Sequence, residues 1–87
     1  MVMAMNLDKN LKKKILALNL ARYLNEKRLS QKTLANRLGM APQQLSFYMK
    51  EHREPSEGNK LKFAQEMGLE NIWELYRMPP GIQPKPI

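Results

Sequence analysis

Cysteine is absent from the 87-residue sequence, and histidine occurs only once, as His52. Without cysteine the chain can form neither a disulfide nor a thiolate metal site, and one histidine excludes a multi-histidine metal cluster. The sequence also has no glycine-rich phosphate-binding loop and no carboxylate pair placed for acid–base chemistry. We therefore expect a protein that is not an enzyme and that binds no metal ion or other cofactor.

Long apolar runs are missing as well. None approaches the roughly 18 residues that a membrane span needs. The apolar start, MVMAMN, is too short for a signal peptide and has no basic residue. We expect a cytoplasmic protein with no membrane contact.

The charge of the chain is basic and unevenly distributed, with a net value of +7. Residues 1–50 contain ten Lys/Arg and two Asp/Glu, whereas residues 51–87 contain five Lys/Arg and six Asp/Glu. A positive field in one half is expected when one face of a small domain meets a polyanion. Solubility alone could explain basic residues, but their concentration favours nucleic acid. Only six residues are aromatic, too few for the stacking platform of single-strand binders, so duplex DNA is preferred to RNA.

Apolar residues recur at three- and four-residue spacing, and no long stretch alternates at a period of two. This pattern predicts an all-α fold. Helix boundaries are marked by a cap at Ser30, by Gly39, by Pro42 at a first helical position and by Gly68. Together these signals predict five helices, over residues 8–27, 31–38, 42–50, 57–67 and 71–76.

A chain of this length forms one domain with a modest core. We expect a compact domain over residues 7–77, between a flexible N-terminus at residues 1–6 and an extended, proline-rich tail at residues 78–87. The side chains predicted to face the core are Leu11, Ile15, Leu16, Leu18, Leu20, Leu24, Leu34, Ala35, Leu38, Leu45, Tyr48, Leu61, Phe63, Ala64 and Met67.

The most informative stretch is residues 30–55, SQKTLANRLGMAPQQLSFYMKEHREP. It predicts two short helices joined by a tight turn, which pack at a steep angle. Ala35 is small where the second helix crosses the first, and Gly39 lets the chain reverse. The first helix can then rest across a phosphate backbone while the second projects outward. A projecting α-helix fits the major groove of B-DNA.

This stretch resembles the helix-turn-helix proteins of the Cro/cI repressor class, also called the XRE family, and the resemblance implies a lambda-repressor-like fold. Three positions depart from the family pattern. Pro42 stands where some repressors have a base-reading glutamine, Met49 where glutamate is common, and Glu51 where glycine is usual. The resemblance extends over about residues 16–75, and its motif falls on Ser30, Gln31, Leu34, Ala35, Leu38, Gly39, Met40, Leu45, Ser46, Tyr48, Pro55, Leu61, Ala64, Met67 and Gly68.

The resemblance also implies which residues contact DNA. Phe47 could contact thymine methyl groups, but it could equally be a core or dimer contact. Base contacts are implied along the second helix of the motif, where glutamine can pair with adenine: Gln43, Gln44, Ser46 and Phe47. Phosphate contacts are implied at the start of the first helix, in the loop after the second and at the start of the next helix: Gln31, Lys32, Lys50, His52, Arg53, Asn59 and Lys60.

These observations predict a sequence-specific regulator of phage or bacterial type, a transcriptional repressor associated with the nucleoid. A homodimer is expected because one short helix reads few base pairs. The candidate dimer contacts are Ile72, Trp73, Leu75 and Tyr76. They could instead close the monomer core, which we favour for Trp73. The alternative function is a protein-interaction module, such as an antitoxin or anti-repressor partner, with the proline-rich tail as its docking segment.

Overall fold

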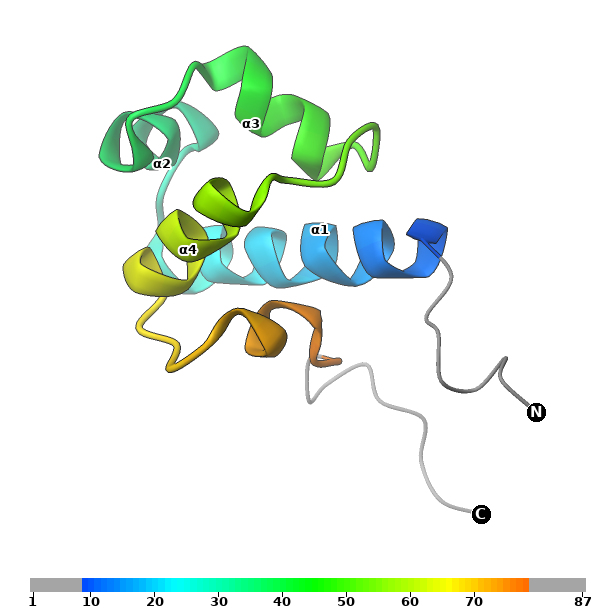
Figure 1. The fold of residues 1–87 in the computed structure, drawn as a ribbon. Coiled ribbons are helices and arrows are strands. Elements are labelled where there is room, and N and C mark those ends of the chain that lie inside the picture. Colours follow the sequence, from blue (N-terminus) through cyan, green and yellow to red (C-terminus); the bar gives the residue numbers. More distant parts are fainter. Residues whose placement is uncertain (1–8, 79–87) are drawn as a thin grey trace, which may run out of the picture.

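The computed structural model describes residues 9–78 and contains four α-helices followed by a 3-10 helix (Figure 1). No strand occurs in this range, in agreement with the all-α prediction. Of the five predicted helices, four are α-helices and the last has 3-10 geometry. The predicted flexible N-terminus and nearly all of the predicted tail lie outside the described residues. The elements are α1 (Lys9–Lys27), α2 (Gln31–Leu38), α3 (Pro42–Met49), α4 (Glu57–Glu66) and η2 (Ile72–Tyr76).

The helix α1 runs through the middle of the fold (Figure 1). It contacts α3 on one side and η2 on the other, while α4 contacts both α2 and η2. The helices α2 and α3 also contact each other. In Figure 1, α3 therefore lies at one edge of the molecule, with α1 between it and η2.

All four α-helices are followed by a residue with left-handed backbone. These residues are Arg28, Gly39, Glu51 and Gly68, with φ angles of 57°, 69°, 66° and 72°. In each case the next amide donates to a carbonyl five residues earlier, which is the Schellman arrangement of a helix C-terminus. The predicted role of Gly39 is confirmed. Glu51, which departs from the family pattern, adopts the backbone that a glycine would take there. The four bonds are Leu29 to Leu24 (2.9 Å), Met40 to Ala35 (3.0 Å), His52 to Phe47 (2.9 Å) and Leu69 to Ala64 (2.8 Å).

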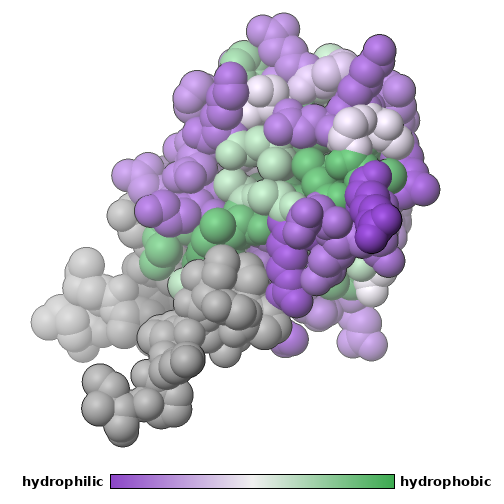
Figure 2. Space-filling model, turned by 180° about the vertical axis from the view of Figure 1, so that it is seen from behind, coloured by the Kyte–Doolittle hydropathy of each residue, from purple (hydrophilic) through white to green (hydrophobic). Residues whose placement is uncertain are grey.

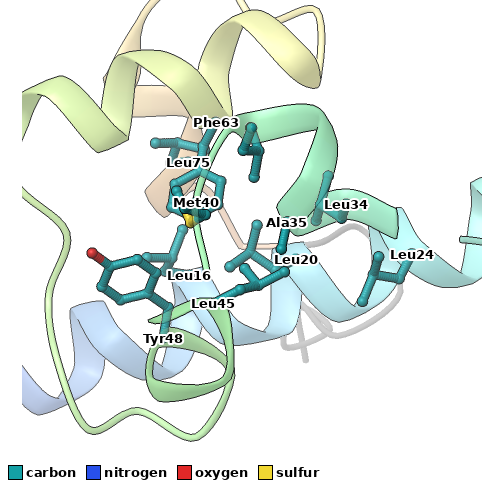
Figure 3. Close-up of a cluster of buried hydrophobic side chains, with 11 residues drawn as sticks. Leu16, Leu20, Leu24, Leu34, Ala35, Met40, Leu45, Tyr48, Phe63 and Leu75 are labelled. Carbon is teal, nitrogen blue, oxygen red and sulfur yellow. The ribbon is translucent and has the colours of Figure 1, made fainter. Parts of the chain in front are cut away.

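One apolar core joins all five elements (Figure 3). The ring of Tyr48 meets the ring of Phe63 edge-on, with centroids 5.7 Å apart. The core therefore fixes α3 against both α1 and α4. Its largest fully buried side chains are Phe63, Leu16, Leu20, Leu34, Leu45 and Leu75.

Two residues predicted for the core are exposed instead. Leu61 on α4 is 53% exposed, and Leu11 in the first turn of α1 is 39% exposed. On α4 the inward positions are those of Lys60, Phe63 and Ala64, at three- and four-residue spacing. Leu61 follows Lys60 by one residue and is turned away from it by about 100°.

None of the helices in the described part of the chain is long and apolar enough to cross a membrane. Within residues 9–78, no group of three or more His, Cys, Asp and Glu side chains is placed to hold a metal ion.

Candidate nucleic-acid interface

The unit formed by α2 and α3 presents one face of α3 outward. Pro42 opens α3 after Ala41, whose extended backbone at φ −67° and ψ 142° starts the helix. Leu45 and Tyr48 are buried and attach the inner face to the core. Gln43 is exposed on the other side, and its side chain makes no hydrogen bond with another described residue.

Gln44 is held in one orientation by its neighbours. Its amide nitrogen donates to the Tyr48 hydroxyl at 3.1 Å, and the side-chain amide of Asn59 donates to the same oxygen at 2.9 Å. The hydroxyl of Tyr48 points away from the apolar cluster (Figure 3). Gln44 is half-buried and keeps its amide oxygen and one N–H for another partner. Ser46 is half-buried as well.

The start of α2 is a second exposed position. The Ser30 hydroxyl accepts a bond from the amide of Thr33 at 3.0 Å, which confirms the predicted cap. Gln31 and Lys32 follow in the first turn, and both are exposed. A helix N-terminus carries partial positive charge and unpaired amides, so this turn suits an anion.

The loop after α3 carries three exposed polar side chains, two of them cationic. Lys50, His52 and Arg53 are all exposed. The guanidinium carbon of Arg53 lies 5.2 Å from the centroid of the Phe47 ring, and the His52 ring lies 6.2 Å from it. Phe47 on α3 is half-buried, and its ring faces these two residues of the following loop.

Lys60 differs from the other candidate phosphate contacts, because its side chain is only 11% exposed. Its ammonium nitrogen lies 3.3 Å from the Glu54 carboxylate and 3.5 Å from that of Glu57. Lys12 also pairs with Glu54, at 3.5 Å, and both lysines lie over the Tyr76 ring. The Lys60 charge is thus already neutralised within the fold, and we leave this residue out of the proposed interface.

Asn59 also uses its polar groups in hydrogen bonds within the domain. Its backbone amide donates to the Ser56 hydroxyl at 3.2 Å, as the cap of α4, and its side chain holds Tyr48. It supports α3 and is also left out of the proposed interface.

The cluster around Glu54 affects two ionisable groups. Burial by itself would raise the pKa of Glu54, but the ammonium groups of Lys12 and Lys60 outweigh burial and hold this pKa below its usual value. Burial raises the pKa of Tyr76, and the Glu54 carboxylate beside its hydroxyl adds to this effect. The cluster joins α1, α4 and η2.

Few of the cations on α2 and in the loop after α3 are used inside the fold. Arg37 pairs with Glu66 at 2.9 Å. Lys32, Lys50 and Arg53 form no ion pair with any residue between 9 and 78. Their charges remain free for an external anion.

The predicted dimer contacts in η2 do not share one face. Leu75 has no exposed surface, so its prediction as a dimer contact is wrong. The indole of Trp73 is 75% exposed, so the favoured expectation that it closes the core is also wrong. Ile72 and Tyr76 are half-buried. A 3-10 helix has three residues per turn, which places Ile72 and Leu75 on one face and Trp73 and Tyr76 on the next.

The surface around these elements is mixed. Figure 2 shows polar and charged residues around most of the outline of the rear face, with apolar residues across its middle. Among the described residues only three large apolar side chains are exposed: Leu11, Leu61 and Trp73.

Comparison with known proteins gave one result that bears on this geometry. A family model described as helix-turn-helix matches residues 20–70, more than half of the chain, and this range includes both α2 and α3. Searches of curated proteins and of solved structures found no match. The matched range and the arrangement of the two helices agree with the family resemblance noted in the sequence. The chain belongs to the helix-turn-helix family of the Cro/cI (XRE) type and is a DNA-binding regulator.

Proposed function

We propose that this regulator binds double-stranded DNA in a sequence-specific manner and reads the major groove with α3. The observation that carries the proposal is the exposed side chain of Gln43 on the outer side of a helix whose inner side is anchored by Leu45 and Tyr48, with the half-buried Gln44 bonded to the Tyr48 hydroxyl beside it. A rigid, projecting helix with hydrogen-bonding side chains near its N-terminus is what the major groove accommodates.

The two glutamines differ in how much freedom they have. Gln43 has an exposed side chain that can adapt to the base it meets. Gln44 is oriented by Tyr48 and loses less freedom on binding, which favours a defined contact. A glutamine amide pairs with adenine through N6 and N7. Ser46 is a further candidate, since a hydroxyl can bond with several bases.

Phosphate contacts would come from segments that precede and follow α3 in the sequence. Gln31 and Lys32 lie at the N-terminus of α2, and Lys50, His52 and Arg53 lie in the loop after α3. Contacts of this kind fix the register of a protein on the duplex and carry no sequence information themselves.

We further propose that the chain acts as a dimeric transcriptional repressor. One helix of this length reads only part of an operator, and two-fold pairing doubles the sequence read. A dimer bound at a promoter blocks access to it, so repression requires no further contact. Trp73 and Ile72 remain as candidate dimer contacts, and a large exposed indole is a frequent anchor of protein interfaces.

The direct test is binding to a labelled duplex at several salt concentrations. If the protein neutralises several phosphates, the logarithm of the binding constant should fall steeply and linearly with the logarithm of the salt concentration. Affinity that is absent, or that does not change with salt, would contradict DNA binding by this surface.

The exposed indole also favours a second candidate function, the protein-interaction module. The variant Trp73→Ala distinguishes a dimer contact from a contact with another protein. Because η2 lies across α1 from α3 (Figure 1), loss of a dimer contact should weaken binding to a two-fold operator and leave binding to a single half-site unchanged. Unchanged binding to both sites, with an unchanged oligomeric state, would show that the indole is not a dimer contact and would leave it free for a protein partner.

A further inference from the structure

The loop after α3 is folded back onto the last turn of the helix. The amide of His52 donates to the Phe47 carbonyl at 2.9 Å, and the amide of Glu51 donates to the Tyr48 carbonyl at 3.1 Å. The left-handed backbone of Glu51, at φ 66°, makes this reversal. Residues 52 and 53 are thereby returned to the side of α3 on which Phe47 lies.

The Phe47 ring serves as a platform for this loop. The Arg53 guanidinium lies over the ring at 5.2 Å from its centroid, within the range of about 6 Å for a cation–π contact. The His52 ring lies at 6.2 Å with an interplanar angle of 33°. The ring thus has two neighbours from the loop.

Arg53 has no anionic partner within residues 9–78. The adjacent carboxylate of Glu54 is engaged by Lys12 and Lys60, and Arg53 itself is exposed. A guanidinium held over a ring by a cation–π contact can still offer N–H groups to an anion, and their planar fork matches two oxygens of a phosphate.

We propose that Phe47 is a positioning residue: its ring holds the Arg53 guanidinium beside α3, ready to bind a backbone phosphate at the edge of the groove. This inference rests on the proposed DNA binding and replaces the expectation that Phe47 contacts a base. A base contact would change sequence preference at one position. A positioning role changes affinity for every duplex equally, since phosphate contacts carry no sequence information.

Binding to a random-sequence duplex of about 20 base pairs, long enough for two half-sites, tests this role. Phe47→Leu keeps an apolar side chain but removes the ring, and Phe47→Tyr restores a ring. We expect Phe47→Leu to weaken binding about two- to fivefold, the effect of one exposed cation–π contact. Phe47→Tyr should bind with the affinity of the wild type. Arg53→Ala should also lower the salt slope by about one unit. The double variant, Phe47→Leu with Arg53→Ala, should bind no more weakly than Arg53→Ala alone.

A second measurement uses the free protein. Ring-current shielding should displace the NMR signals of the Arg53 side-chain protons in the wild type and in Phe47→Tyr, and Phe47→Leu should abolish this displacement. The same spectra report whether each variant is folded.

Three results would overturn the inference: unshifted Arg53 signals in the wild type, additive losses in the double variant, or a Phe47→Leu variant that binds the random-sequence duplex as tightly as the wild type. A wild-type chain that binds no duplex would refute the proposed function itself, and the Arg53 shift would still report the stacking.

Discussion

The side-chain amide of Asn59 on α4 donates a hydrogen bond of 2.9 Å to the hydroxyl of Tyr48 on α3. The same hydroxyl accepts from Gln44 at 3.1 Å. The aromatic ring of Tyr48 belongs to the core, whereas its hydroxyl group is bonded to two polar side chains near the surface. One residue thus connects the packing of the domain with the orientation of a candidate base contact.

This relationship predicts the effect of Tyr48→Phe, which removes the acceptor and keeps the ring. The variant should lose about 1 kcal/mol of unfolding free energy, the usual value of one net hydrogen bond. For a domain of this size that corresponds to a fall in Tm of about 4–8 °C. In a double-mutant cycle with Asn59→Ala, the two losses should be non-additive. Additive losses would show that the bond does not contribute to stability.

The left-handed backbone of Glu51 predicts that replacing this residue with glycine stabilises the fold. Its φ of 66° is costly for a residue with a Cβ, so Glu51→Gly should stabilise the fold by about 0.5–1 kcal/mol, after the added freedom of glycine in the unfolded chain is subtracted. Gly39→Ala is the matched control. Beyond the adjacent backbone, no atom lies within 4 Å of the Cβ that alanine would add at position 39. The loss of about 1 kcal/mol expected for Gly39→Ala would therefore reflect backbone strain alone. Urea unfolding measures both variants, and a destabilised Glu51→Gly would contradict the assignment.

The cluster around Glu54 predicts a pH dependence. The pKa of Glu54 is lower in the folded chain than its ordinary value of 4.5. The carboxylate therefore contributes its full stability above pH 4.5, and this contribution is lost as the pH falls through the lower pKa of the folded state. Glu54→Gln should be less stable than the wild type at neutral pH, and the difference should shrink below pH 4.5. Denaturant unfolding at several pH values measures this stability difference. A difference that does not change with pH would show that the ionised Glu54 carboxylate does not stabilise the fold.

The candidate base contacts and the candidate phosphate contacts predict different effects on DNA binding. Gln44→Ala should cost about 1–3 kcal/mol at one operator position and relax specificity there. Gln31→Ala, at the start of α2, should weaken binding to all sequences about equally. Competition binding against operators with single base changes distinguishes the two profiles. An equal loss on every sequence for Gln44→Ala would refute its role in reading bases.

Much of this architecture follows from local signals in the sequence. Ser30 and Gly39 mark the two ends of α2, and Pro42 marks the start of α3, because each residue meets a specific backbone requirement of a helix end. The predicted bounds of α2 agree with the structure, and α3 and α4 each end one residue earlier than predicted. Such signals act over one turn and do not depend on the rest of the fold.

The remainder depends on contacts between distant residues. Lys60 occupies an inward position on α4 because Glu54, Glu57 and the Tyr76 ring receive its ammonium group, and no local pattern indicates this. The exposure of Trp73 depends on η2 having three residues per turn. The stacking of Arg53 on Phe47 depends on the left-handed backbone of Glu51, at a position where sequence alone leaves the loop undetermined.

The central claim is that α3 reads bases in the major groove. Selection of bound sites from random duplex DNA tests it most directly, with the wild type and Gln43→Ala treated in parallel. We predict a two-fold symmetric consensus whose half-sites lie about one helical turn apart, with Gln43→Ala losing preference at defined positions in each half-site. Recovery of no consensus, or of the same consensus with Gln43→Ala as with the wild type, would contradict the account.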